Sequence, residues 1–219
     1  MTAGRNVRIL IVDDHEMIRQ GLQFLIASEQ DMEVCGEAED EQQALTLFQT
    51  SKPDLVILDI SLKSGSGIDV LKRLHAHDAA VPIVIQTMHD ERVYGERVFR
   101  AGAVAYVNKN DPAHSLITAI RTVLAGRLYY SPAMAGYAMQ RFVQGQTGIN
   151  SFMLERLTDR ELEVFQLLGQ GLATNQIAEK LHVTRSTIDS YRQRLKTKLA
   201  IKSGHELVRY ATHWTLDSR

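Results

Sequence analysis

The sequence predicts an α/β domain followed by an all-α domain. Up to about residue 126, short runs rich in Val and Ile alternate five times with amphipathic segments of helical period. Short, continuously apolar runs are typical of buried parallel strands, and regular strand–helix alternation indicates a doubly wound sheet. From Leu157 onward no run resembles a strand, and four helical segments follow one another. The length of 219 residues is enough for two modest domains.

The apolar runs define the first domain, and the helical patterns define the second. Strands are expected at 7–12, 32–38, 54–59, 81–87 and 103–109. Helices are expected between and after them, at 15–28, 40–50, 67–77, 90–101 and 111–126. Four more helices are expected at 158–170, 174–181, 184–199 and 203–214. Residues 127–153, with Ser131-Pro132 and several glycines, are expected to form a linker with room for one helix near 132–144. The predicted domains are therefore 6–126 and 154–216.

The composition indicates an ordinary globular protein, with 44% hydrophobic and 23% charged residues. The single cysteine, Cys35, excludes an intrachain disulfide and is expected to be a small buried side chain. The apolar stretch near the N-terminus is interrupted at once by two aspartates, which predicts neither a signal peptide nor a membrane span. We therefore expect a cytoplasmic protein without a membrane partner.

The net charge of −1 hides a local excess of positive charge near the C-terminus. From Thr184 to Lys202 there are six basic residues and one acidic residue, Asp189. The rest of the chain is acidic on balance. A basic helix in such a chain indicates a polyanionic partner for the second domain.

Functional side chains are expected where the predicted strands end. Asp13-Asp14 follow the first strand, while Asp59, Thr87 and Lys109 end the third, fourth and fifth. The carboxyl ends of parallel strands share one edge, so these residues are expected to converge. Three carboxylates in one place repel each other unless a cation is bound, and oxygen ligands suit Mg²⁺. A carboxylate nucleophile, a metal, a lysine and a hydroxyl are the groups that phosphoryl transfer requires.

Residues 6–126 resemble the receiver domain of bacterial response regulators. The resemblance rests on IVDDHEMIRQGL, LVILDISLKSGSGIDVL, IVIQTMHD and AGAVAYVNK, in the expected order and spacing. It implies a flavodoxin-like, five-stranded parallel sheet with Asp59 as the phosphoacceptor. It also implies that Mg²⁺ is held by Asp13, Asp14, Asp59 and the backbone carbonyl of Ser61, that Lys109 contacts the phosphoryl group, that Thr87 is the switch hydroxyl and that Tyr106 is the switch aromatic.

Taken singly, each of these residues has an ordinary structural interpretation. A lone aspartate at a strand end usually caps a helix or a turn, and a lone tyrosine is usually a core aromatic. His15 and His89, which flank the site, are expected to be plain surface residues. Lys63 stands where many receivers have proline, so the loop 61–66 is expected to be less rigid than usual. Asn110 stands where many receivers have a second proline, which the subfamily with a helix-turn-helix domain often lacks.

The helix expected at 184–199 has one apolar face and one polar face. Thr184 or Ser186 is expected to cap it, and its inward residues recur at intervals of three and four, as Ile188, Tyr191, Leu195 and Leu199. The opposite stripe of short polar groups, edged by cations, suits the DNA major groove. The residues expected to face DNA are Arg185, Ser186, Asp189, Ser190, Arg192, Gln193, Arg194, Lys196 and Lys198. Asp189 has two open roles, accepting from a cytosine amino group or capping the helix.

Residues 154–216 resemble a LuxR-type helix-turn-helix domain, which begins with a capping box at Thr158 and Glu161. The whole chain resembles the NarL/FixJ family of response regulators. This implies a sensor histidine kinase and double-stranded DNA as partners, a homodimer as the active form, and RNA polymerase as a further candidate partner. It also implies that phosphorylation repositions Thr87 and Tyr106 and shifts the surface around 90–101 and 103–108.

Two other functions are compatible with parts of the sequence. Haloacid-dehalogenase-like phosphatases also use an aspartate nucleophile, but they need a second acid two residues later, where this chain has Ser61. A constitutive DNA-binding protein would not need an intact acidic site. We therefore expect a regulator and not an enzyme.

Overall fold

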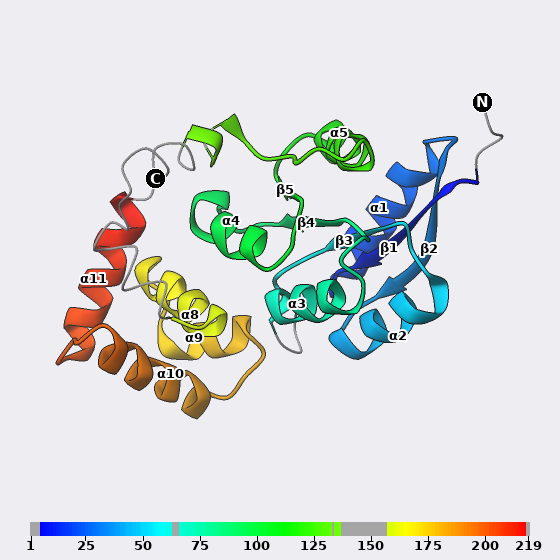
Figure 1. Ribbon diagram of the computed structural model, residues 1–219. Coiled ribbons are helices and arrows are strands. Elements are labelled where there is room, and N and C mark those ends of the chain that lie inside the picture. The colour runs from blue at the N-terminus through cyan, green and yellow to red at the C-terminus, as the bar shows by residue number, and fades with distance from the viewer. Residues whose placement is uncertain (1–4, 63–65, 133, 137–156, 218–219) are drawn as a thin grey trace. The chain divides into compact units, whose positions relative to one another are not determined.

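The computed structural model describes residues 5–62, 66–132, 134–136 and 157–217. The chain divides into two compact units, residues 1–137 and 138–219, and Figure 1 shows the elements of both. The first unit is an α/β sandwich and the second contains only helices where it is described. This confirms the predicted fold classes. Lys63 and most of the predicted linker lie outside the described residues.

The sheet of the first unit is fully parallel, with the strand order β2-β1-β3-β4-β5. Its strands are β1 (Val7–Val12), β2 (Met32–Ala38), β3 (Leu55–Leu58), β4 (Ile83–Thr87) and β5 (Ala105–Asn108). The order reverses between β1 and β3, and open α/β sheets bind ligands beyond the carboxyl ends of their strands at such a reversal. The fold is therefore flavodoxin-like, as expected, and the predicted acidic site lies at the switch point.

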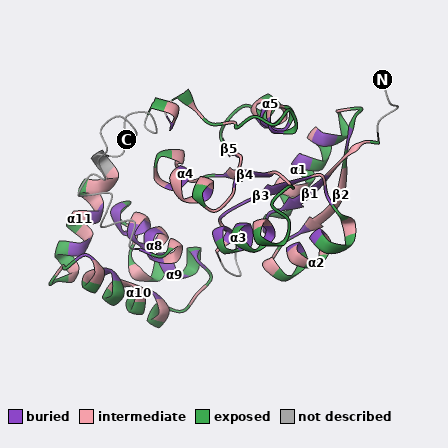
Figure 2. Cartoon of the chain, viewed as in Figure 1, coloured by how far each residue is buried: buried purple, intermediate pink, exposed green. Residues whose placement is uncertain are grey.

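Helices cover both faces of this sheet (Figure 1). They are α1 (Glu16–Ala27), α2 (Glu41–Ser51), α3 (Gly67–His77), α4 (Glu91–Arg100) and α5 (Ala113–Leu124). One core lies between the sheet and the α1–α5 layer, and it includes Ile26, Ile57 and Ile120. Both faces of the central strands are buried (Figure 2), which explains why their sequences are continuously apolar rather than alternating.

The edge strand β2 contains a bulge. The register with β1 shifts between Ile9 and Leu10, which pair with Val34 and Gly36, so Cys35 is the extra residue. Cys35 is half-buried, and its Sγ lies 3.6 Å from the Oγ of Ser51. The expectation of a buried side chain was therefore wrong, because Cys35 is the extra residue of a bulge on an edge strand and is covered only in part.

The segment after α5 returns to the sheet. We call residues 129–132 and 134–136 the strap. Tyr129 forms an isolated parallel bridge with Ala105 of β5, and a helical turn follows in which the N–H of Ala135 donates to the carbonyl of Ser131 at 3.0 Å. The remainder of the helix expected at 132–144 lies outside the described residues.

The second unit contains α8 (Asp159–Gly169), α9 (Thr174–Lys180), α10 (Arg185–Lys198) and α11 (Gly204–Asp217). Phe165 of α8 is fully buried, with ring centroids 5.8 Å from Tyr210 and 5.6 Å from Trp214 of α11. Ile188 and Leu195 of α10 are also fully buried. These residues form the core against which α10 presents its apolar face.

Among the described residues, none of the helices is both long enough and apolar enough to cross a membrane.

Candidate functional site

Three aspartates meet at the carboxyl ends of β1 and β3. Asp13, Asp14 and Asp59 are 2%, 6% and 2% exposed. One oxygen from each of them and one ring nitrogen of His15 all lie within 4.8 Å of one another. His15 is exposed, but its Nδ1 lies 2.7 Å from Asp14 Oδ1 and 3.3 Å from Asp13 Oδ1, so it is not the plain surface residue that was expected. The sequence-predicted aspartates therefore form one buried cluster of negative charge with a histidine at its rim.

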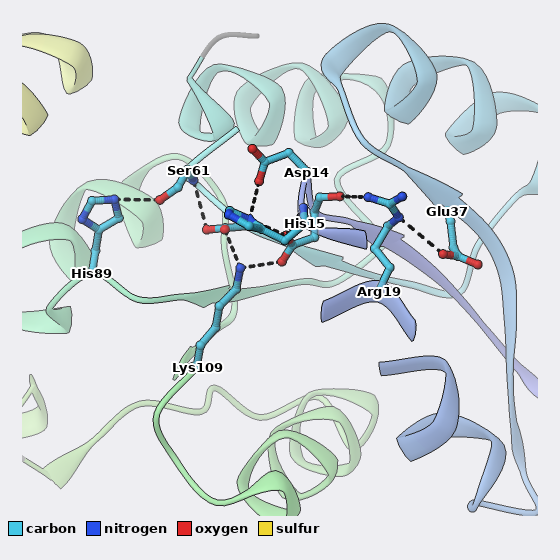
Figure 3. A network of polar contacts seen from close by, with 9 residues as sticks. Asp14, His15, Arg19, Glu37, Ser61, His89 and Lys109 are labelled. Carbon is cyan, nitrogen blue, oxygen red and sulfur yellow. Dashed lines mark hydrogen bonds and ion pairs between the residues drawn. The ribbon is translucent and has the colours of Figure 1, made fainter. Parts of the chain in front are cut away.

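Lys109 reaches this cluster from the end of β5. Its Nζ lies 2.5 Å from Asp13 Oδ2 and 2.6 Å from Asp59 Oδ2 (Figure 3). Burial by itself would lower the pKa of Lys109, but the charges of Asp59 and Asp13 outweigh it and raise the pKa. The lysine is therefore held in its charged form, where it neutralises part of the cluster.

The cluster fits a divalent cation. Burial raises the pKa of Asp13. The negative charge of Asp59 raises the pKa of Asp13 further, whereas Lys109 lowers it, and the net shift is upward. The lysine thus does not fully compensate three adjacent carboxylates, and a further positive charge would stabilise their ionised forms. The ligands are hard oxygen atoms, which Mg²⁺ prefers. Asp13, Asp14 and Asp59 could therefore hold Mg²⁺.

His89 connects the Asp59 loop to the loop after β4. The N–H of Ser61 donates to Asp59 Oδ1 at 3.0 Å, and Ser61 Oγ lies 2.8 Å from His89 Nε2 (Figure 3). The His89 ring also packs on Tyr94 of α4, with centroids 4.5 Å apart. The expectation that His89 is a plain surface residue was wrong. The sequence did offer a signal. His89 follows Thr87 by two residues, as Ser61 follows Asp59 by two residues, and both pairs stand at the ends of neighbouring predicted strands.

Thr87 and Tyr106 are both buried, and both contact the backbone of His89. Thr87 ends β4 and is fully buried, and its Oγ1 lies 3.4 Å from the N–H of His89. The hydroxyl of Tyr106 donates to the carbonyl of His89 at 3.0 Å, as does the side-chain amide of Asn108. Burial raises the pKa of Tyr106 well above its usual value, so its phenol stays protonated and able to donate. The predicted switch residues are therefore joined through the His89 backbone.

The exposed face of α10 is the face predicted from the sequence. Ile188, Leu195 and Leu199 are buried, whereas the opposite side is exposed along the helix (Figure 2). The exposed polar residues of that side are Ser186, Asp189, Ser190, Gln193 and Thr197. This stripe is therefore exposed within the second unit.

The cations beside this stripe differ in what they contact. Arg192 Nη1 donates to Thr174 Oγ1 of α9 at 2.9 Å, and the guanidinium of Arg194 lies 5.8 Å from the centroid of the Tyr191 ring. Arg185 lies 3.8 Å from Asp189. The side chain of Thr184 accepts from the backbone of Thr187 and caps α10, so Asp189 is not the cap.

Lys198 has a partner inside the second unit. Its Nζ lies 2.6 Å from Oε2 of Glu161, which is 2% exposed and completes the predicted capping box with Thr158. Burial would raise the pKa of Glu161, but hydrogen bonds from Lys198 and Thr158 hold it below its usual value. The pair joins the start of α8 to the end of α10. The capping box was visible in the sequence, whereas the lysine 37 residues away was not.

Known families match both halves of the chain. Residues 9–121 match the family described as response regulator receiver domain, and residues 155–211 match bacterial regulatory proteins, luxR family. The two matches define a response regulator that carries a LuxR-type DNA-binding domain. This is a class of regulators and not a known class of enzymes.

Similar proteins match most of the chain. The oxygen regulatory protein NreC of Staphylococcus epidermidis is 35% identical over 210 residues, covering 94% of this chain and 96% of NreC. A LuxR-family response regulator from Aurantimonas covers 63% of this chain and 99% of its own, with 35% identity and a TM-score of 0.59. RcsB of Salmonella typhimurium, at 23% identity, shares the fold over 96% of this chain and 98% of its own, with a TM-score of 0.63. The chain belongs to the NarL/FixJ family of response regulators.

Proposed function

We propose that this regulator accepts a phosphoryl group on Asp59 from a sensor histidine kinase, and that the reaction controls its dimerisation and promoter binding. The observation that carries the proposal is the buried aspartate cluster bridged by Lys109. Asp59 is the member that both Lys109 and the N–H of Ser61 contact. Asp13 likewise contacts Lys109 and accepts from the N–H of His15. The choice of Asp59 as the acceptor therefore rests on its match to the receiver motif, and the two donors hold its carboxylate in place.

The proposed reaction moves the phosphoryl group from an imidazole to a carboxylate. An Asp59 oxygen attacks phosphorus, the P–N bond to the kinase histidine breaks, and its electron pair stays on the imidazole nitrogen. Lys109 compensates negative charge on the phosphoryl oxygens. Bound Mg²⁺ would supply further charge neutralisation, with Asp13, Asp14, Asp59 and the backbone carbonyl of Ser61 as its proposed protein ligands.

The switch is proposed to act through Thr87 and Tyr106. Both contact the backbone of His89, one through its N–H and the other through its carbonyl. A new interaction between Thr87 and the phosphoryl group would therefore move the loop that Tyr106 holds. Such a population shift changes the surface of α4 and β5, which we propose alters contacts with a second protomer, with the DNA-binding domain or with RNA polymerase.

A hydrolase is the weaker alternative. The residue two positions after Asp59 is Ser61, whose hydroxyl is hydrogen-bonded to His89. A phosphatase of the haloacid-dehalogenase type needs an acid there to protonate the leaving group. A stable phosphoaspartate that signals through the fold is the function that these contacts favour.

The function is tested by mapping bound DNA across the genome in cells with the wild-type chain and with Asp59→Asn. We expect the wild type to occupy a defined set of promoters that the variant, at equal protein level, leaves largely empty. Equal occupancy by both proteins would show a constitutive DNA-binding protein. Occupancy of no specific sites by either would contradict the proposed DNA-binding function.

We expect different residues of α10 to read bases and to bind phosphates. Gln193 is exposed on the stripe, so Gln193→Ala should cost about 1–3 kcal/mol at its cognate base pair and relax sequence preference there only. Arg194→Ala should weaken binding to all duplexes about equally and reduce the salt slope by roughly one charge. Titrations against specific and scrambled duplexes at several salt concentrations measure both quantities. If Gln193→Ala and Ser190→Ala both leave the specificity ratio unchanged, α10 does not read bases with this stripe.

A further inference from the structure

The strap is attached to the edge of the sheet at β5. The N–H of Tyr129 donates to the carbonyl of Val104, and the N–H of Tyr106 donates to the carbonyl of Tyr129, both at 3.0 Å. The Tyr129 side chain packs against the core under the sheet. The strap thus uses backbone groups of β5, including those of the proposed switch tyrosine.

The strap is also attached to α4. The N–H of Ser131 donates to Oε1 of Glu91 at 3.1 Å, and the Tyr130 ring meets Phe99 edge-on, with centroids 6.2 Å apart. Met134 is 6% exposed. The strap therefore spans two separate elements, one strand and one helix.

Gly95 explains how Met134 fits against α4. A Cβ at position 95 would lie 3.0 Å from Met134 Cε and 3.2 Å from Met134 Sδ. Glycine inside a helix is destabilising relative to alanine. Here the missing side chain makes room for the strap.

The two attachment points are the elements that the Asp59 site contacts. On one path, Ser61 bonds Asp59 and His89, and the His89 carbonyl accepts from Tyr106 of β5. On the other path, the His89 ring packs on Tyr94 of α4. Contacts therefore run from Asp59 through His89 to both supports of the strap.

We propose that the strap is a latch, docked on α4 and β5 while Asp59 is unmodified and released when Asp59 is phosphorylated. The inference rests on the proposed function of Asp59. The strap contacts both α4 and β5, so it can keep all its contacts in only one relative position of these elements. A shift of the His89 loop that moves α4 relative to β5 would therefore break some of these contacts. Release uncovers this face of α4 and β5.

The test is hydrogen–deuterium exchange of the full chain, read at the amides of Tyr129 and Tyr106. With acetyl phosphate and Mg²⁺, these amides should exchange at least about tenfold faster in the wild type and remain slow in Asp59→Asn. Intact mass of the same samples reports phosphoryl uptake. Uptake with unchanged exchange overturns the latch alone, whereas no uptake in the wild type overturns the proposed function and the latch with it.

Variants of the docking surface test the latch without a phosphodonor. An alanine Cβ at position 95 would press on Met134 Cε and Sδ and on Glu91 Cγ, at 3.0–3.2 Å, and Met134→Ala removes the Met134 contact without adding bulk. We expect both changes to weaken docking and to speed exchange at Tyr129 in the unmodified protein, with the larger effect in Met134→Ala. The matched control is Gly21→Ala in α1, where an added Cβ meets nothing within 4 Å, and exchange should stay slow. Slow exchange in both docking variants, or fast exchange in the control, overturns the proposal.

Discussion

Asp59→Asn is expected to abolish phosphoryl uptake completely. With acetyl phosphate and Mg²⁺, the wild type should gain one acid-stable, base-labile phosphoryl group, because Asp59 is the carboxylate oriented by both Lys109 and Ser61. A carboxamide is not a nucleophile toward phosphorus, so the variant should gain none. Intact mass spectrometry measures the result. Chelating Mg²⁺ should suppress the wild-type reaction as well, because the cluster would lose the cation that balances its charge.

Asp78→Asn provides the matched control. Asp78 is exposed and follows the last residue of α3, away from the carboxyl ends of the strands, so this variant should be phosphorylated like the wild type. Uptake by Asp59→Asn at the wild-type rate would mean that another group is the acceptor.

Lys198→Met is expected to destabilise the second unit by about 3 kcal/mol. Removing the lysine leaves Glu161 buried without its ion-pair partner, and a broken buried pair typically costs about 3–5 kcal/mol. The lower value applies because the side chain of Lys198 is 33% exposed and its pair is partly screened. The chain has a single tryptophan, Trp214, which packs on Phe165 in this unit. Urea unfolding followed by Trp214 fluorescence therefore measures the loss.

The control for Lys198→Met is a second change at its partner. Glu161→Gln combined with Lys198→Met removes both charges while the glutamine can still accept from the N–H of Thr158. The double variant should regain much of the lost stability. A double variant as unstable as Lys198→Met would show that the lysine contributes packing and not charge compensation.

The same pair predicts opposite pH dependences for two proteins. In the wild type, the pKa of Glu161 lies below its usual value, so the stabilisation is complete above the unfolded pKa of about 4.3 and is lost as the pH falls through the folded pKa. In Lys198→Met, the buried Glu161 has no lysine partner, so its pKa should rise above its usual value. Protonating Glu161 then removes a buried unpaired charge and should stabilise the variant. The stability gap between the two proteins should therefore narrow on acidification. A difference in unfolding free energy between the two proteins that stays constant from pH 7 to pH 4 would show that Lys198 does not stabilise the fold by pairing with ionised Glu161.

The strand-end residues could be predicted because one topological rule places them together. Once five parallel strands are assigned, Asp13, Asp59 and Lys109 must share an edge, and the structure brings their side chains into contact. Helix caps were predictable for a similar reason, since Thr158 and Glu161 interact over a spacing of three residues. In both cases the geometry depends on local pattern or on the order of elements, and not on individual side-chain packing.

Long-range partners of side chains could not be predicted in this way. Lys198 was expected among the DNA contacts because it carries charge beside the exposed stripe, but the packing of α8 on α10 gives it Glu161. The sequence contains several cations close to Lys198, and only the three-dimensional structure shows which of them pairs with Glu161. The strap was unpredictable for a related reason. Its residues have the composition of a linker, and its docking depends on Gly95, which lies in another element.

The bulge at Cys35 bears on aggregation. An outer strand with a regular row of unpaired backbone groups is a template for a strand of another molecule. In β2 the extra residue interrupts that row and increases the local twist, and the charged residues Glu33 and Glu37 lie on either side of it. A strand from a second molecule could form regular backbone hydrogen bonds with only part of β2, because the register changes at the bulge. We therefore expect the irregularity to disfavour edge-to-edge association of two molecules through β2.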